Sequence, residues 1–420
     1  RDAQAVTLAQ ISEAAKVCKR LGLQDAEING LMRAIKYQIA VSQYKAALES
    51  GKTIVKAAQE INRADLENEG RLYHGQATMR QGRYKEALRL LSKVLKNSQS
   101  MKLNFFTGRA YQLIGTTLIT SNKHAKGIPY LEKALPIYQD LDLKQDMANV
   151  FNDMGIASQA QGLFEEAISF WTQGQRIFQA IGNREGNARI LTNLSALNLD
   201  LGDFESAQHY GKRGLEVCRE INANLGECIN LLNLSLASFF LEQENESEVY
   251  CHAAIYIAQT LNNDHILANA NRELGLILTH LRRMTEALEA YEYTLEIAER
   301  IDQPTLIHEA RAGIAHILLQ EGEGTLATQI IAPTIEALTS GFKLDGAAHP
   351  FRVYQICYLV MLLEEDSRAQ ELLETAYNNL QVRINRINNP EKRAYYSNIL
   401  EHKQIIRAYK ASPHSKPVLH

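Results

Sequence analysis

One short phrase recurs along this chain, and its spacing limits what the chain can fold into. The residues QGRYKEAL (81–88) return in altered form as QGLFEEAI (161–168) and LGDFESAQ (201–208). The alanine of the phrase belongs to a register with a 40-residue period, and every member is small: Ala47, Ala87, Gly127, Ala167, Ala207, Ser247, Ala287 and Ala327. A fixed period of this size is typical of repeat architectures, in which each repeat is one supersecondary unit.

Three further registers share this period. A second small position comprises Gly75, Gly115, Gly155, Ser195, Ser235, Gly275 and Ala315. An aliphatic position comprises Leu21, Ile61, Met101, Leu141, Ile181, Ile221, Leu261 and Ile301. Three residues before the small residue of the phrase, the first half of the chain carries mostly large rings: Tyr44, Tyr84, His124, Phe164 and Phe204. Because these registers coincide, the 40-residue repeat is the unit from which the fold is predicted.

Each repeat is predicted to be a hairpin of two helices. Apolar residues follow helical spacing in two blocks, such as 146–160 and 164–180, and a Gln-Gly turn at 161–162 separates the blocks. Small residues at Gly155 and Ala167 let the two helices approach closely. A single hairpin cannot bury both of its faces, so stacking against neighbouring repeats is what stabilises it.

Composition narrows the class of protein. The 420 residues carry a formal net charge of -3, which argues against a general nucleic-acid binder. No run of about 18 apolar residues is present, so no membrane span or membrane association is predicted. The five cysteines lack a CxxC spacing and favour neither a disulfide framework nor a zinc site: Cys18, Cys218, Cys228, Cys251 and Cys357. A reducing, cytoplasmic setting fits this cysteine usage best.

The turn motif resembles a known repeat family. A small residue is followed twelve residues later by an alanine that closes a G-x-[FY]-x-x-A phrase, at Gly155 with GLFEEA and at Ser195 with GDFESA. This pattern resembles the tetratricopeptide repeat (TPR), whose ordinary length is about 34 residues. Longer repeats look like those of kinesin light chains, peptide-binding quorum-sensing regulators, and the sensor regions of maltose-regulator-type and other STAND ATPases.

The resemblance covers residues 1–382 and implies an all-α fold, a TPR-like right-handed superhelical solenoid of helical hairpins. Two features depart from the family pattern. No proline ends the second helix, and the repeats from residue 303 onward lose the aromatic residue at the turn.

The repeat count predicts four segments. Residues 1–22 are expected to form the second helix of a truncated repeat, and 23–342 eight 40-residue TPR-like repeats. Residues 343–382 are expected to form a degenerate ninth repeat, and 383–420 a capping helix and a tail. Asn389 and Pro390 suit the N-cap and the first position of that helix. Because the chain begins in mid-hairpin with Arg1, it is expected to be part of a longer protein.

One stretch imitates a nucleotide site. Gly51-Lys52-Thr53 has the ending of a phosphate loop, but Ala46 occupies the position of the required earlier glycine. A helical pattern also runs through the stretch from Gln43 to Ile61. We therefore interpret it as an exposed helix and predict no nucleotide cofactor.

Histidine, cysteine and asparagine motifs favour structural interpretations. His308 and His316 lie eight residues apart, yet no HExxH motif or cysteine supports a metal site there. Cys218 and Cys228 flank a turn and are expected to be free thiols. The glycosylation-like Asn-Leu-Ser sequences at 193–195 and 233–235 recur by repeat symmetry, which favours a structural or ligand-facing role.

The first helix of each hairpin carries the predicted binding residues. In TPR proteins this helix lines the concave wall, and an asparagine two residues before the small position holds a peptide backbone. That position reads Asp153, Asn193, Asn233 and Glu273 here. The neighbouring groove positions carry Arg109, Asn149, Asn152, Arg189, Asn269 and Arg272. Amides suit an extended backbone and arginine suits a carboxylate or phosphate, while the competing interpretation is a solvated helix face.

Function is predicted from this wall, since spacing alone assembles no nucleophile, base and orienting group. We expect a non-enzymatic module that binds a protein or peptide on its concave face and uses neither cofactor nor metal. The leading hypothesis is the sensor or scaffold region of a larger signalling regulator, with an ATPase or effector domain upstream. The alternatives are a stand-alone peptide-binding quorum-sensing-type regulator and the non-catalytic part of a larger enzyme.

Overall fold

The computed structural model describes residues 10–11, 13–18, 20–41 and 43–412, and across them every regular element is a helix. The chain forms two compact units. The first comprises the residues up to Gln161 together with Ser169–Gly182, and the second comprises Gly162–Ile168 together with the residues from Asn183 onward. Half of the segment 1–22 lies outside the described residues, as does the whole of the tail 413–420.

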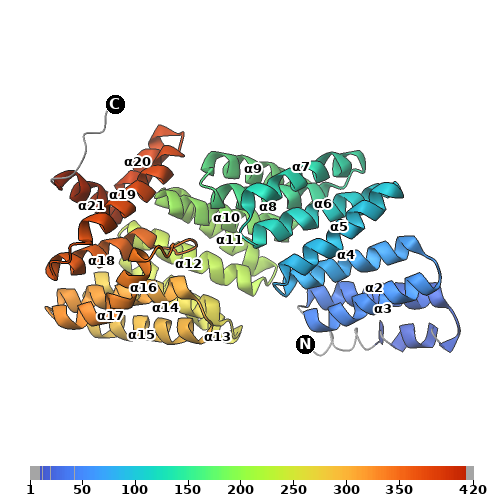
Figure 1. The fold of residues 1–420 in the computed structure, drawn as a ribbon, viewed down its shortest axis with the longest axis horizontal. Helices are drawn as coiled ribbons and strands as arrows, with labels where there is room; N and C mark the ends of the chain where they lie inside the picture. Colours follow the sequence, from blue (N-terminus) through green and yellow to red (C-terminus); the bar gives the residue numbers. More distant parts are fainter. Residues whose placement is uncertain (1–9, 12, 19, 42, 413–420) are drawn as a thin grey trace. The chain divides into compact units, whose positions relative to one another are not determined.

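Consecutive helices stack as antiparallel neighbours in each unit (Figure 1). The first unit contains α2 (Gln24–Ala40), α3 (Tyr44–Glu60), α4 (Ala64–Arg80), α5 (Tyr84–Ser100), α6 (Asn104–Thr120), α7 (His124–Asp140) and α8 (Lys144–Ala160). Helix α9 (Phe164–Ala180) contributes its first residues to the second unit and the rest to the first. The second unit continues with α10 (Arg184–Leu201), α11 (Phe204–Glu220), α12 (Asn224–Phe240), α13 (Glu244–Thr260), α14 (Asp264–His280), α15 (Met284–Arg300), α16 (Pro304–Gln320), α17 (Gly324–Thr339), α18 (Pro350–Leu363), α19 (Ala369–Asn385), α20 (Pro390–Asn398) and α21 (Leu400–Ala411).

The turns explain why the helices have such uniform lengths. At a constant interval, half of the repeat period, a left-handed residue ends a helix, and glycine or asparagine fills most of these positions: Asn62, Gly82, Lys102, Asn122, Asp142, Gly162, Gly182, Gly202, Asn222, Glu242, Asn262, Arg282, Asp302 and Gly322. At Gly82 the turn is closed by backbone bonds from Gly82 N–H to the Met79 carbonyl (2.9 Å) and from Arg83 N–H to the Thr78 carbonyl (3.2 Å). Such a pairing satisfies carbonyls that the helix end leaves open.

The small register allows the two helices of a hairpin to touch. In the first unit, a methyl group added at Gly155 would come within 2.4 Å of the Trp171 indole nitrogen. That nitrogen donates to the Asn152 carbonyl at 3.1 Å. At residue 195 in the second unit serine takes the place of glycine, and the Ser195 hydroxyl donates to the Ala207 carbonyl of the facing helix at 2.8 Å. Both solutions need a small residue, which is why the register tolerates little else.

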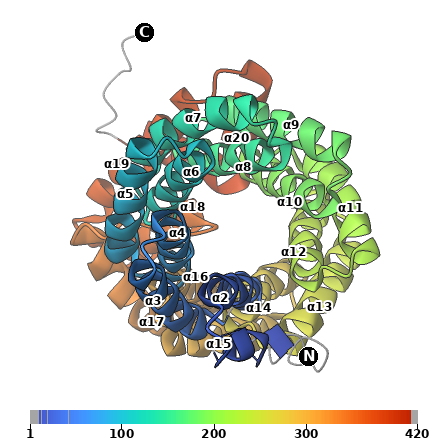
Figure 2. The ribbon, with the colours of Figure 1, turned by 90° about the vertical axis from the view of Figure 1, so that its right-hand side faces the viewer.

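Each unit has two layers of helices. In the repeats, the even-numbered helices, α2 to α8 in the first unit and α10 to α16 in the second, lie side by side in one layer, and the odd-numbered helices that follow them form the other (Figure 2). These even-numbered helices are the first helices of the hairpins. In the second unit we call the face of α10, α12, α14 and α16 that points away from the odd-numbered helices the wall.

The 40-residue register is lost between α17 and α18. The other first helices begin at a constant interval, which would place the next start at residue 344, but α18 begins at Pro350. Residues 340–349 form an irregular connection instead. The predicted ninth repeat is therefore a displaced hairpin, α18 and α19, and it extends to Asn385.

The end of the chain folds back onto the start of the second unit. The carboxylate of Glu165 accepts the backbone N–H groups of Asn388 (3.0 Å) and Asn389 (2.9 Å). Asn389 caps α20 and Pro390 begins it, as predicted. The prediction of one capping helix is wrong. The backbone at Ile399 is extended (ψ 134°), and this break divides the segment into two helices, α20 and α21.

The stretch that imitates a phosphate loop is part of a helix. The Gly51-Lys52-Thr53 stretch lies inside α3, where the Lys52 ammonium pairs with Glu49 at 2.8 Å. Within the described ranges, the helices fall short of the length and apolar character needed to traverse a lipid bilayer.

Candidate binding surface

The α10 and α12 section of the wall carries polar side chains in register. Arg189 is exposed and Asn193 is half-buried, both on α10. Asn233, one repeat later on α12, is buried, and its amide donates to the Thr192 carbonyl at 3.3 Å. Arg189 and Asn193 therefore keep surface accessible to solvent, and the Asn233 amide bridges α12 to α10.

An apolar stripe accompanies these polar residues. Leu225, Ile229, Leu232 and Leu236 recur along α12 at intervals of three or four residues and are exposed or partly exposed. Leu225 keeps half of its surface accessible, 50%. Helical spacing places these side chains on one face of α12. The binding residues predicted from the sequence were all polar and did not include this stripe. Its three- and four-residue spacing is nevertheless visible in the sequence.

The predicted residues of the first unit form a network of their own. Arg109 on α6 pairs with Asp146 on α8 at 3.0 Å, and Asp153 on α8 accepts from the Thr116 hydroxyl at 2.6 Å. Asn149 is half-buried and Asn152 is buried beside this network. These polar side chains join α6 to α8, in addition to any role toward a partner.

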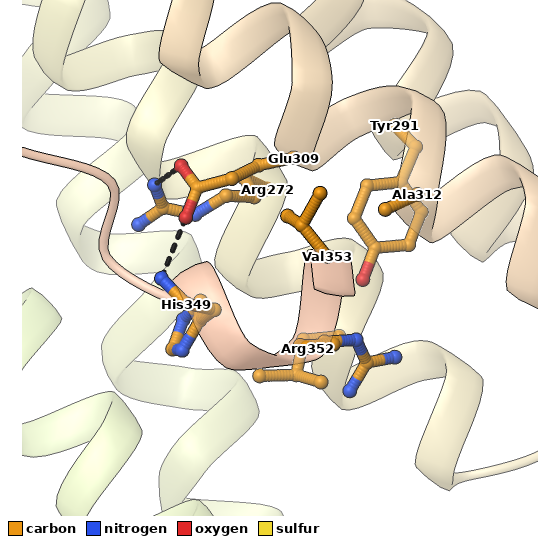
Figure 3. A pocket seen from close by; sticks show the side chains of 8 residues that line it. Arg272, Tyr291, Glu309, Ala312, His349, Arg352 and Val353 are labelled. Carbon is orange, nitrogen blue, oxygen red and sulfur yellow. Dashed lines mark hydrogen bonds and ion pairs between the residues drawn. The ribbon is translucent and has the colours of Figure 1, made fainter. Parts of the chain in front are cut away.

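The α14 and α16 section of the wall contains a buried cluster of charges, which we call the charge cluster: Arg272, Glu273, Glu309 and His349. Arg272 pairs with the neighbouring Glu273. It also pairs with Glu309 at 2.8 Å (Figure 3). His349 reaches this site from the connection before α18, and its backbone N–H donates to Glu309 at 2.6 Å. The His349 ring nitrogen Nε2 lies 3.1 Å from Glu273. Arg272, predicted to face a partner, is instead 6% exposed and held by two carboxylates.

The charges of the cluster stabilise one another. Burial disfavours the ionised form of Glu273, but the charges of Arg272 and His349 outweigh burial and lower its pKa to about 2. Burial likewise opposes protonation of His349, but the charge of Glu273 and the hydrogen bond to it raise the pKa of His349 above its ordinary value. An ionised Glu273 beside a protonated His349 is therefore the favoured state at mildly acidic pH.

The remaining candidate residues have local partners. Asn269 on α14 is half-buried, and its amide donates to the His265 carbonyl of its own helix at 2.7 Å. His308 contacts the Thr334 hydroxyl at 3.0 Å and His316 contacts the Gln320 amide at 2.7 Å. In the described part of the chain, no group of three or more His, Cys, Asp or Glu side chains is arranged to hold a metal ion.

The cysteines flanking the α11–α12 turn are free and buried. Burial raises the pKa of the Cys228 thiol to about 11, and that thiol donates to the Ala254 carbonyl at 3.2 Å. Burial also raises the pKa of Cys218. Neither thiol has the depressed pKa that a reactive cysteine requires.

Comparison with known proteins matches parts of the chain and the fold. Two tetratricopeptide repeat models match residues 108–140 and 146–220. No curated protein matches the sequence. Among solved structures, a Rap protein complexed with Competence and Sporulation Factor is 13% identical with a TM-score of 0.57, covering 91% of this chain and 98% of that chain.

Two further solved structures share the fold. The apo form of the quorum sensor NprR from B. thuringiensis is 13% identical with a TM-score of 0.60, covering 80% of this chain and 97% of that chain. A STAND protein with a tetratricopeptide repeat sensor from Pyrococcus horikoshii is 15% identical with a TM-score of 0.56, covering 77% of this chain and 54% of that chain. The helical hairpins, the two layers and these matches together show that the chain has a tetratricopeptide repeat fold, with repeats matched directly over residues 108–140 and 146–220.

Proposed function

We propose that the α10 and α12 section of the wall binds an extended peptide segment of a partner protein or a free peptide. One observation carries this proposal. Exposed Arg189 and half-buried Asn193 lie on α10, and the neighbouring helix α12 carries the apolar stripe. The amide of Asn193 offers a donor and an acceptor to a peptide backbone. The guanidinium of Arg189 suits an acidic side chain or a C-terminal carboxylate.

The stripe supplies the apolar half of the site. Leu225 and its neighbours on α12 would bury apolar side chains of the peptide, at about 25 cal/mol per Å² of area removed from water. Peptide binding of this kind is supported by the Rap protein and by NprR, which was also solved in complex with its cognate peptide NprX. The peptide we propose therefore alternates apolar groups with at least one acidic group.

We further propose that the module acts as a sensor or scaffold within a larger regulator. The STAND protein with a tetratricopeptide repeat sensor supports this setting, since the present chain spans about half the length of that protein. In that arrangement an upstream ATPase or effector domain would respond to the peptide. A peptide-binding regulator that acts alone is the alternative, supported by the coverage of nearly the whole of NprR.

The test is partner capture followed by affinity measurement. The chain would be used to capture partners from its native lysate, and the captured partner would then be titrated against Arg189→Ala/Asn193→Ala/Asn233→Ala. We expect at least a tenfold loss of affinity, about 1.4 kcal/mol, with the helical signal retained and the loss of stability limited to about 1 kcal/mol for each asparagine. Arg272→Ala is left out of the set because it would break the charge cluster.

Arg213→Ala is the matched control, because Arg213 is an exposed arginine on α11 in the other layer. It removes the same charge and should leave affinity unchanged. Equal loss in both variants would indicate a nonspecific charge effect and would contradict the proposed site. Unchanged affinity in the folded triple variant would move the site to another surface.

A further inference from the structure

The connection between α17 and α18 lies on the wall. We call residues 341–349 the strap. Its left-handed residues Gly341 (φ 91°) and Gly346 (φ 87°) give it a path that no helix could take. Between them Leu344 is buried, at 4% exposure. The other hairpins are joined by short turns such as 141–143, so the strap is an addition to the repeat and not part of it.

The strap contacts the repeats that precede it through two of its residues and buries a third. Phe342 packs edge-on against the His308 ring of α16, with ring centroids 4.9 Å apart. Leu344 is buried, at 4% exposure. His349 supplies the polar contact, with its backbone N–H on Glu309 and its ring on Glu273.

The strap and the start of α18 cover a position that is open in the preceding repeats. Ala196 on α10 and Leu236 on α12 are half-buried, whereas the equivalent residue of α14, Leu276, is 5% exposed. Leu276 lines a cavity together with His349, Arg352 and Val353, so this difference comes from the segment laid over α14. At the register position of Glu273 burial does not depend on the strap, because Asn233 on α12 is also buried.

The covered interface is imperfectly satisfied. Among the described residues, the Nε–H groups of Arg272 and Arg352 have no hydrogen-bond partner. A cavity of about 10 Å³, lined in part by both arginines and by Tyr291, lies between α18 and the wall. An unsatisfied buried donor costs stability, so this interface is weaker than its buried charges alone would indicate.

We propose that the strap is a built-in occupant of the α14 and α16 section of the wall, and that the surface beneath it is a second peptide site, which takes a basic side chain. This inference rests on the proposed function, because it extends the peptide-binding wall by two repeats. His349 occupies the site as a ligand would, offering one backbone N–H and one cationic ring to Glu309 and Glu273.

The charges define the ligand class. Two carboxylates, Glu273 and Glu309, face one guanidinium, Arg272, so the empty site carries one net negative charge that a cation neutralises. Arg352, which follows on α18, also lines the cavity, but its charge is paired with Glu401 at 3.7 Å. Lysine, arginine or protonated histidine next to a free backbone N–H fits these partners.

Protonation of His349 sets how tightly the strap is held. Docking raises the pKa of His349 above 6.5, its ordinary value, against the opposing effect of burial and of Arg272. The stabilisation is therefore complete below pH 6.5 and is lost as the pH rises through the raised pKa. Arg272, Glu273 and Glu309 on the wall are the charges that act on the ring, and Arg352 on α18 lines the adjoining cavity.

The test uses a labelled peptide of residues 341–351, GFKLDGAAHPF, as the probe. The full chain with Leu344→Ser/His349→Ala should release the strap and bind the probe at least tenfold more tightly than the native chain. A second probe with glutamine in place of its histidine leaves the protein unchanged and should bind at least tenfold more weakly. Binding of the first probe should also weaken as the pH rises above 6.5.

Hydrogen exchange of the strap amides, corrected for intrinsic rates, shows whether the variant has released the strap. Released amides without probe binding would overturn the proposal, as would equal affinity of the two probes. Amides that keep native protection in the variant would also overturn it, because Leu344 and His349 would then not hold the strap. The assay needs no lysate partner, so its failure is distinct from failure of the Arg189 variants.

Discussion

The two sections of the wall in the second unit share a register but differ in what their side chains face. On α10 and α12, Asn193 is half-buried and Arg189 exposed, and an apolar stripe lies beside them. On α14 and α16, the equivalent position is Glu273, buried in the charge cluster beneath the strap. The position of a residue in its repeat therefore determines whether the residue lies on the wall. The segment packed over that residue, such as the strap, determines whether a partner can reach it.

The largest difference between the sections should appear in stability. Glu273→Gln leaves Arg272 and His349 with one carboxylate fewer in a buried site, and breaking such a pair costs about 3–5 kcal/mol. Asn193→Ala at the same register position removes one amide from a half-buried site and should cost about 1 kcal/mol. Urea unfolding followed by circular dichroism compares the two. Equal losses would show that the charge cluster is not what stabilises the covered section.

The next effect is the pH dependence of the covered section. His349→Gln removes the protonated ring, so native chain and variant should differ most below pH 6.5 and converge as the pH rises through the raised pKa of His349. Taking the difference cancels other histidines, such as His316 and His402, whose pKa values burial lowers to about 4. A difference in unfolding free energy between native chain and variant that grows as the pH rises would contradict this prediction.

Asn233→Ala tests the bridge within the open section. Its amide donates to the Thr192 carbonyl across α10 and α12, so removal should cost about 1 kcal/mol of stability. The loss should be independent of pH, unlike that of His349→Gln. Unchanged stability of Asn233→Ala would show that this hydrogen bond does not stabilise the fold, which would leave Asn233 a role in partner binding only.

The smallest effect is expected at Lys52 in the first unit. Lys52→Ala removes an exposed side chain paired with Glu49 on the same helix and should change stability by no more than about 0.5 kcal/mol. ATP should not raise the melting temperature of either form, since the lysine lies on a helix without a glycine-rich loop. Micromolar nucleotide affinity by calorimetry would contradict this.

The repeat period was sufficient to predict the hairpins because each turn needs a left-handed residue at a fixed interval. It could not predict the strap, because Phe342 falls where the interval requires such a residue and Gly341 takes that conformation instead. The displaced start of α18 follows from that shift. Gly341, Gly346 and Pro350 were readable as a break in register, but their path over α14 depends on tertiary contacts.

The site was predicted less completely, and for a physical reason. Neighbouring first helices place residues 37 apart opposite one another, as in Arg109 with Asp146 and Arg272 with Glu309. An alignment at the 40-residue period does not place these opposite charges side by side. Arg272 was therefore predicted to contact a partner, although it is already paired with Glu309. A search for opposite charges at that second spacing would have found both pairs.

The most direct test is hydrogen exchange of the chain with and without its captured partner. The account predicts slower exchange in Arg184–Leu201 and Asn224–Phe240, with Asp264–His280 unchanged while the strap stays docked. Protection confined to the helices of the other layer, such as Phe204–Glu220 and Glu244–Thr260, would contradict the claim that the open section of the wall binds the partner.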